Sequence, residues 1–170
     1  DPNRLTENFI RTIQKTDLNN QFQIVVGDRE NDDFQKLEFL IENSPKTFKG
    51  SITLYERPDN FYAMLESCSI AVVAGGLIAF ESVARGLPVL GVPQYEHQLN
   101  TLENLEKMGV AYLCGTPGVL DESKLVTLIS TLLKDQPLRQ SISEKGPLVI
   151  DGGGMDRVIS KISQYLQGNN

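Results

Sequence analysis

The sequence predicts an α/β protein built on a Rossmann-like, doubly wound parallel sheet. Short apolar runs of strand length alternate with longer segments of helical periodicity along the 170 residues. The runs at 70–74 and 89–92 are continuously apolar and bounded by turn residues, which is typical of parallel strands covered on both faces. The length and the apolar content of 40% fit one globular domain with its own core.

The first third of the chain predicts three helices and two strands. Leu5, Phe9 and Ile13 recur at helical spacing, and Asp1 ahead of Pro2 suits an N-cap followed by a proline in the first turn. A break at Pro58-Asp59 precedes a further short helix. The expected elements are a helix at about 2–16, a buried strand at 23–27, a helix at 33–42, a strand at 51–55 and a helix at 61–65.

The same alternation continues to the end of the chain. Gly109 is a natural C-cap for the helix before it, and the glycines at 152–154 suggest a hinge. Strand–helix–strand order predicts right-handed crossovers. The expected elements are strands at 70–74 and 89–92, a helix at 100–108, a strand at 110–113, and helices at 122–134, 137–145 and 155–166.

The bulk properties exclude several classes of protein. A net charge of −6 with scattered Lys and Arg argues against nucleic-acid binding, and no apolar run reaches the ~20 residues of a membrane span. No signal peptide opens the chain. Cys68 and Cys114 lack metal spacing, so we expect both to be reduced, buried and structural in a cytoplasmic protein. The opening Asp1-Pro2 resembles the start of a fragment of a longer protein.

The glycine turn between the strand at 70–74 and the next helix is the main candidate site. The backbone N–H groups of Gly75, Gly76 and Leu77 can bind phosphate at a helix N-terminus, although glycine pairs also form plain tight turns. Open α/β sheets bind ligands at the carboxyl ends of their strands. Glu81, early in the helix, can accept hydrogen bonds from vicinal ribose hydroxyls or simply complement the helix dipole.

A second polar cluster follows the strand at 89–92. The loop after Pro93 contains the chain's only histidine, His97, and three hydrogen-bonding neighbours: Gln98, Asn100 and Thr101. Such a mixture of donors and acceptors suits sugar hydroxyls. A lone histidine is more often structural, and no carboxylate partner that would make it a general base can be named from the sequence.

Three blocks in this order resemble one family: MLESCSIAVVAGGLIAFESVARGLPVLGVP, then EHQLNT, then LEKMGVA. The run 52–109 is similar to the C-terminal, nucleotide-sugar-binding half of GT-B glycosyltransferases. Within them it most resembles the group of the lipid II GlcNAc transferase, the UDP-sugar hydrolases of the pseudaminic acid pathway and spore-coat polysaccharide proteins. The resemblance implies that residues 1–170 are a single nucleotide-sugar-binding domain, one half of a GT-B fold.

The resemblance also implies roles for individual residues. Tyr55, Glu56 and Arg57 would lie along the uracil, largely through backbone contacts. The turn at 75–77 would hold the diphosphate and Glu81 the ribose hydroxyls. The cluster after Pro93 would face the sugar, with His97 and Gln98 in contact and Asn100 and Thr101 nearby.

Further expectations concern the reaction and its partners. The family carries a strand and a glycine-rich loop just ahead of the helix that starts with Asp-Pro, and an N-terminal domain that supplies the acceptor site and the catalytic base. Both would precede Asp1, so the catalytic residues are unknown and we expect the fragment alone to be inactive. We expect UDP to be displaced from an anomeric carbon with no cofactor and no required metal, because a helix N-terminus can stabilise the departing diphosphate. The sequence also leaves open whether the protein is associated with a membrane through its N-terminal half.

Three alternatives stay open at this stage. Hydrolysis and glycosyl transfer rank nearly level, with EHQLNT slightly favouring the hydrolase-like group. A non-catalytic module that senses a nucleotide sugar would keep the same fold. A sugar-nucleotide epimerase ranks lower, since its expected acidic and histidine pairs are not evident.

Overall fold

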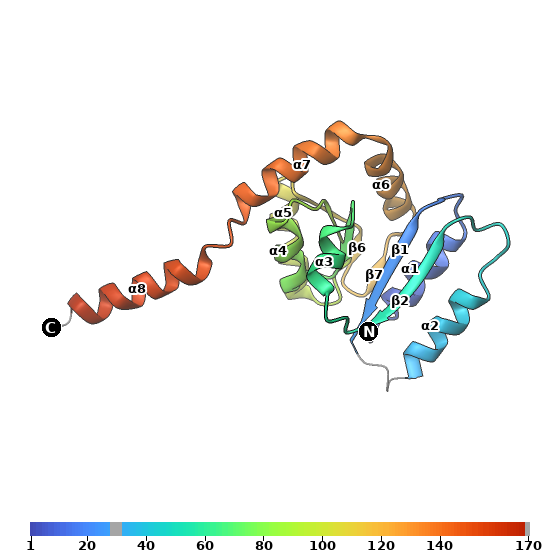
Figure 1. Cartoon of the computed structure of the whole chain (residues 1–170), viewed down its shortest axis with the longest axis horizontal. Helices are drawn as coiled ribbons and strands as arrows, with labels where there is room; N and C mark the ends of the chain where they lie inside the picture. The colour runs from blue at the N-terminus through green and yellow to red at the C-terminus, as the bar shows by residue number, and fades with distance from the viewer. Residues whose placement is uncertain (28–31, 169–170) are drawn as a thin grey trace.

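The strands form two separate parallel ladders and a small hairpin in the computed structural model, which describes residues 1–27 and 32–168 (Figure 1). The first ladder pairs β1 with β2, and the second has the order β3-β4-β5. β6 and β7 are antiparallel. The strands are β1 (Gln21–Val26), β2 (Ser51–Glu56), β3 (Ala71–Val73), β4 (Val89–Gly91), β5 (Ala111–Leu113), β6 (Gly115–Thr116) and β7 (Val119–Leu120).

Helices alternate with the parallel strands, which confirms the α/β class. Every described helix falls on a segment for which the sequence predicts one. They are α1 (Leu5–Gln14), α2 (Asp32–Glu42), α3 (Phe61–Glu66), α4 (Leu77–Ala84), α5 (Glu96–Lys107), α6 (Glu122–Lys134), α7 (Gln136–Val149) and α8 (Gly154–Gly168).

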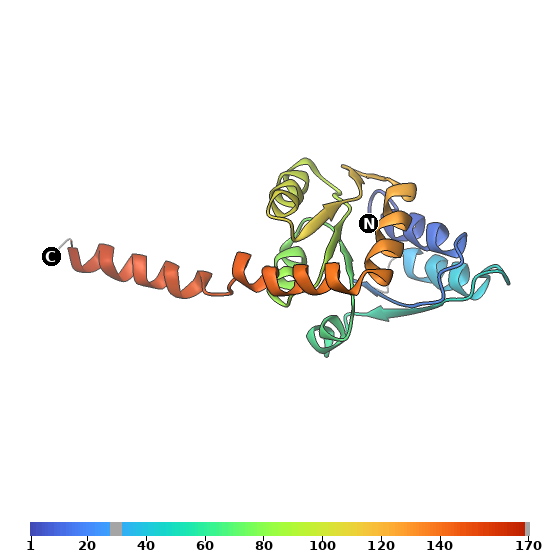
Figure 2. The ribbon, with the colours of Figure 1, turned by 90° about the horizontal axis from the view of Figure 1, so that it is seen from above.

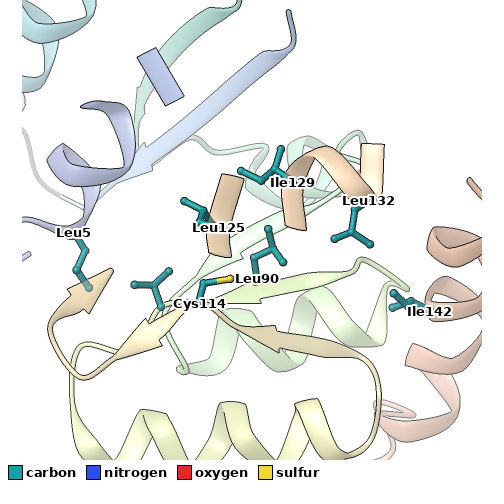
Figure 3. Close-up of a cluster of buried hydrophobic side chains, with 8 residues drawn as sticks. Leu5, Leu90, Cys114, Leu125, Ile129, Leu132 and Ile142 are labelled. Atoms are coloured by element: carbon teal, nitrogen blue, oxygen red, sulfur yellow. The ribbon is translucent and has the colours of Figure 1, made fainter. Parts of the chain in front are cut away.

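The β3-β4-β5 ladder is covered on both faces, as the apolar runs predict. On one face Leu90 packs in a fully buried cluster with side chains of α1, α6 and α7 (Figure 3). On the other face Val89 packs against Ala79 and Val83 of α4 and Leu102 of α5. Alternate side chains of one strand therefore enter two cores, which is the doubly wound arrangement.

The β1-β2 ladder is covered on one face only, so the expectation of a buried strand at 23–27 is wrong. Ile24 is buried against Ile10 of α1 and Leu37 of α2, whereas Gln21 and Gln23 are exposed. The sequence QFQIVV alternates polar and apolar residues, a pattern of half-buried strands.

Local hydrogen bonds move two predicted helix starts. α1 begins at Leu5, later than expected, and the Asp1 carboxylate accepts hydrogen bonds from the Leu5 and Thr6 N–H groups at 3.0 and 2.7 Å. Asp1 thus supplies the predicted cap from outside the helix. α5 begins at Glu96, four residues before the predicted start, and the Gln98 side chain in its first turn accepts a hydrogen bond from the Gln94 N–H at 2.8 Å.

The two cysteines have different environments. Cys114 is fully buried in the first core, and burial raises the pKa of its thiol to about 12. Cys68 is only half-buried, so the expectation that both are buried is wrong for this residue. Burial still raises the pKa of the Cys68 thiol. Both are free thiols.

The helix α8 extends away from the rest of the protein (Figures 1 and 2). It follows Gly152, whose φ of 72° places it in the left-handed region expected of a hinge glycine. Apolar side chains along α8 are exposed; they are Met155, Val158, Ile159, Ile162, Tyr165 and Leu166. Within the described residues, no helix combines the length and the apolar character that crossing a membrane would require.

Candidate functional site

The glycine turn after β3 and the first turn of α5 lie against each other. A Cβ added at Gly75 would stand 2.4 Å from the Gln98 carbonyl oxygen, so only glycine allows this approach. Parallel pairing of β3 with β4 explains the contact, because the carboxyl ends of neighbouring strands reach the same edge of the sheet. The structure therefore brings together the two polar segments that the sequence singles out.

The start of α4 lacks a side-chain cap. Gly76 occupies the N-cap position in an extended conformation, and a Cβ there would meet no heavy atom within 4 Å. By contrast, the carboxylates of Asp1, Asp121 and Asp135 bond to the N-terminal N–H groups of α1, α6 and α7. The first N–H groups of α4 thus combine the positive end of the helix dipole with open space, which suits an anion.

Glu81 lies little more than one turn into α4. Its Oε1 accepts a hydrogen bond from the Tyr62 hydroxyl at 3.0 Å. Its Oε2 is buried and has no hydrogen-bond partner. A buried carboxylate oxygen without a donor is costly, so this atom is a natural acceptor for a ligand hydroxyl.

Tyr62 is a site residue that the sequence analysis missed. It lies on α3, and the guanidinium of Arg85, the residue just after α4, stands 4.5 Å from its ring centroid. The same guanidinium lies 3.4 Å from a carboxylate oxygen of Glu66. The hydrogen bond from the Tyr62 hydroxyl to Glu81 and the negative charge of Glu81 raise the pKa of Tyr62. No local signal links positions 62 and 81, because only the packing of α3 on α4 joins them.

The cluster after Pro93 lies on α5. The expectation of a loop is wrong for His97 and Gln98, whereas Asn100 and Thr101 lie in the helix predicted at 100–108. The His97 ring is exposed and stacks on Tyr95, with centroids 5.7 Å apart. The Thr101 hydroxyl donates to the His97 carbonyl at 3.3 Å. His97, Asn100 and Thr101 therefore share one side of the helix, where Asn100 is also exposed.

Gln98 has a structural role in this arrangement. Its Oε1 accepts a hydrogen bond from the Gln94 N–H at 2.8 Å, which ties the end of β4 to the first turn of α5. The side-chain oxygen of Gln94 is buried without a partner. Gln94 was not among the predicted site residues, although its spacing of four from Gln98 is the available signal.

The predicted uracil segment lies at the end of β2. Tyr55 and Glu56 pair with the last two residues of β1, and the Arg57 N–H continues the ladder by donating to the Val26 carbonyl at 3.2 Å. Arg57 has a φ of 36°, in the left-handed region that few non-glycine residues adopt. It shares a hollow of about 370 Å³ with Gln94, whereas Tyr55 and Glu56 do not line that hollow.

A larger hollow than the one beside Arg57 lies elsewhere. A groove of about 610 Å³ runs between β1 and β3, and its lining does not include the glycine turn, Glu81 or His97. The candidate site thus lies at the carboxyl ends of the strands, outside this groove. Over the residues described, no group of three or more His, Cys, Asp or Glu side chains is arranged to hold a metal ion.

Comparison with known proteins finds similarity both in sequence and in structure. The chain is 28% identical over 119 residues to the spore coat polysaccharide biosynthesis protein SpsG of Bacillus subtilis. The match covers 70% of this chain and 35% of SpsG. The structure superposes with a TM-score of 0.57 on the glycotransferase of kitacinnamycin, at 15% identity. That match covers 85% of this chain and 43% of the other. No family model matches the chain.

These comparisons bear on fold and on family resemblance. The chain spans about a third of the length of the curated relative and less than half of the solved one. The structural likeness, at its low identity, concerns the fold alone. The predicted resemblance is confirmed: the chain is similar in sequence to a spore coat polysaccharide biosynthesis protein, and its α/β fold matches part of a solved glycotransferase.

Proposed function

We propose that this chain is the nucleotide-sugar-binding domain of a GT-B-fold enzyme of surface polysaccharide or nonulosonic-acid biosynthesis. The reaction would displace UDP from a UDP-sugar, with water or a sugar hydroxyl as the attacking group. The observation that carries the proposal is the uncapped start of α4 beside Glu81, whose buried Oε2 has no donor. Similarity to SpsG supports the polysaccharide context.

The start of α4 would bind the diphosphate. Its free N–H groups and helix dipole stabilise negative charge, and that charge grows on the diphosphate as the bond to the anomeric carbon breaks. The same contact therefore serves both binding and leaving-group stabilisation. Glu81 would accept the two ribose hydroxyls, one of them on Oε2.

The exposed side of α5 would face the sugar. His97 and Asn100 offer donors and acceptors there, next to the glycine turn. The acceptor site and the catalytic base would come from a second domain of the longer protein, and we therefore assign neither to residues 1–170. The proposal for this chain is thus a binding half with a leaving-group site.

Calorimetry of the full-length protein with UDP tests the binding step, with ADP and CDP as base controls. We expect Glu81→Gln to weaken UDP binding by about 10- to 100-fold, because a hydrogen bond to a charged group contributes about 1.5–3 kcal/mol. Glu144→Gln is the matched control, since Glu144 is an exposed glutamate of α7 whose carboxylate accepts a hydrogen bond from the Gln140 side-chain amide. Equal UDP affinity in wild type and Glu81→Gln would remove the ribose role.

Product analysis separates the remaining functions. The full-length protein is incubated with UDP-GlcNAc, and released UDP is measured with and without a sugar acceptor. Release without acceptor indicates a hydrolase, and release that depends on acceptor indicates a transferase. Tight binding with no release over a panel of UDP-sugars favours a sensing module, and an isomerised sugar still attached to UDP indicates an epimerase.

A further inference from the structure

The helices α3 and α4 are joined at the candidate site by an arginine and a tyrosine. α3 follows β2 and lies beside α4 (Figure 1). Arg85, just after α4, forms an ion pair with Glu66 of α3 at 3.4 Å, and its guanidinium also donates to the Glu81 carbonyl at 3.1 Å. The same guanidinium stands 4.5 Å from the centroid of the Tyr62 ring. Arg85 therefore holds α3 on the helix that carries Glu81.

This arrangement fixes the position of the Tyr62 hydroxyl. Arg85 covers one face of the ring, and the ring of Phe61 meets it at 66° with centroids 5.5 Å apart. A guanidinium over a phenol ring is attractive, because the ring face carries partial negative charge. The ring is thus in contact on two sides, and its hydroxyl reaches Glu81 Oε1 at 3.0 Å. The hydroxyl is a fixed donor beside the proposed ribose position, although Tyr62 itself is 49% exposed.

The hydrogen bond from Tyr62 determines how the Glu81 carboxylate is oriented. The last torsion of a glutamate side chain has broad energy minima, so a carboxylate without a donor turns easily. A donor on Oε1 removes that freedom and makes the two oxygens different. Oε1 has a partner, whereas Oε2 is buried and has none. A carboxylate offers about four acceptor positions and the tyrosine uses one, so positions remain on both oxygens for the two hydroxyls of a ribose.

We propose that Tyr62 is a positioning residue for ribose recognition, which holds the Glu81 carboxylate in the orientation that accepts the vicinal hydroxyls of a ribonucleotide. The inference rests on the proposed function, because that function assigns the ribose to Glu81. Orientation by Tyr62 lowers the cost of ordering the glutamate side chain when the ligand binds. The consequence is a preference for ribonucleotides over 2′-deoxyribonucleotides, which lack one of the two donors.

The test compares two ligands that differ by one hydroxyl. Calorimetry measures the affinities of the full-length protein for UDP and for 2′-deoxy-UDP, and the ratio of the two affinities is the ribose preference. Tyr62→Phe removes the hydroxyl but keeps the ring that packs against Arg85 and Phe61. Tyr165→Phe is the matched control, since Tyr165 is an exposed tyrosine of α8, which extends away from the rest of the protein.

Tyr62→Phe should reduce the ribose preference. We expect wild type to bind UDP about 10-fold or more tightly than 2′-deoxy-UDP, because the deoxy sugar leaves a charged acceptor without its hydrogen bond. A single hydroxyl can bond to either oxygen in many orientations, whereas the diol needs both oxygens at once. Loss of orientation therefore weakens UDP binding more, and Tyr62→Phe should lower the preference by about 2- to 10-fold. Tyr165→Phe should leave it unchanged.

The ratio also separates positioning from a structural role. If Tyr62 only joined α3 to α4, its loss would weaken binding of both ligands alike and leave the ribose preference at its wild-type value, which would overturn the inference. Urea unfolding of each variant checks that the compared proteins are folded.

A double variant shows whether Tyr62 acts through Glu81. Glu81→Gln should remove most of the ribose preference. Because Tyr62 is proposed to work by orienting this carboxylate, Tyr62→Phe should change the preference no further in the Glu81→Gln background. Additive losses would show that Tyr62 contacts the nucleotide on its own, and the positioning role would be wrong.

The remaining results distinguish failure of the inference from failure of the proposed function. If Glu81→Gln removes the ribose preference and Tyr62→Phe retains it in full, the inference is wrong and the proposed function stands. Tighter UDP binding by Tyr62→Phe would also overturn the inference, because Tyr62 would then compete with the ribose for Glu81. Absence of UDP binding in wild type, or equal affinity for UDP and 2′-deoxy-UDP, would remove the ribose role of Glu81 and the inference with it.

Discussion

The adjacent residues Gly75 and Gly76 are glycines for different physical reasons. Gly75 packs against the backbone of α5, where a Cβ would stand 2.4 Å from the Gln98 carbonyl oxygen. Gly76 has open space around its Cβ position, and its φ of −94° is accessible to any residue. The first glycine is required by packing, whereas the second leaves room in front of the start of α4.

This difference predicts opposite effects of two matched substitutions. Gly75→Ala should lower the free energy of unfolding by about 1–3 kcal/mol, because α5 must shift to admit the methyl group. Gly76→Ala should leave stability within about 1 kcal/mol of wild type but weaken UDP binding, since the methyl group enters the proposed diphosphate space. Urea unfolding and calorimetry measure the two quantities. Equal destabilisation by both substitutions would contradict the packing argument.

The Tyr62–Glu81 hydrogen bond predicts a pH dependence. The pKa of Tyr62 is raised, mainly by its bond to Glu81, so the protonated hydroxyl is favoured in the folded state. The stabilisation by this bond is fully present below the ordinary tyrosine pKa of about 10 and is lost as pH rises through the higher folded value. The ultraviolet titration curve of Tyr62 is obtained by subtracting the curve of the Tyr62→Phe variant from that of wild type. Its midpoint should lie above that of free tyrosine, and Glu81→Gln should lower the midpoint. An unshifted midpoint in wild type would argue against the bond in solution.

At the scale of elements, the sequence predicts where helices and parallel strands occur but not how tertiary contacts adjust their ends. The order and type of α1 to α8 and β1 to β5 follow from periodicity and punctuating glycines. The early start of α5 depends on the bond from Gln94 to Gln98, and the β6-β7 hairpin consists of two-residue strands with no periodicity to detect. The glycine turn and its neighbour at His97 were predictable, whereas Tyr62 reaches the site only through packing.

The crossing of α7 over α4 depends on glycine contacts between the two helices. A Cβ at Gly146 would stand 2.3 Å from the Val83 carbonyl oxygen. Gly86, just after α4, has a φ of 74° and lies against Ser143 of α7. Close backbone approach thus fixes α7 on the helix that carries Glu81.

Alanine at Gly146 should therefore be more harmful than helix propensity suggests. We expect Gly146→Ala to lower the free energy of unfolding by about 1–3 kcal/mol, although alanine is the better helix former. Gly154→Ala is the matched control: that glycine begins α8, a Cβ there meets nothing within 4 Å, and the change should be neutral or stabilising by up to about 1 kcal/mol. Denaturant unfolding of both variants decides the matter, and a stabilised Gly146→Ala would show that α7 packs differently.

At the scale of the whole molecule, the sequence predicts the alternation of layers but not the break between β1 and β3. The pattern specifies which face of each strand is apolar, and this is why the doubly wound ladder was predictable. Pairing across the sheet depends on which strand lies beside which, and a single sequence carries little information about that. The sequence also does not predict that α8 is exposed, because its apolar periodicity is that of a helix packed on a core.

Removing α8 tests whether that helix belongs to the core of this domain. Its apolar side chains are largely exposed, including Met155 at 71% and Leu166 at 63%, so they contribute little to burial within the chain. A chain ending at Asp151 should unfold within a few degrees of the full 170-residue chain, since both retain the same buried clusters.

An exposed apolar stripe also promotes association, so the shortened chain should associate less at high concentration. Ile159→Lys combined with Ile162→Glu should reproduce that loss with the helix still present. Thermal unfolding and sedimentation velocity give the two readouts, and a large drop in the unfolding temperature after truncation would place α8 against the domain in solution.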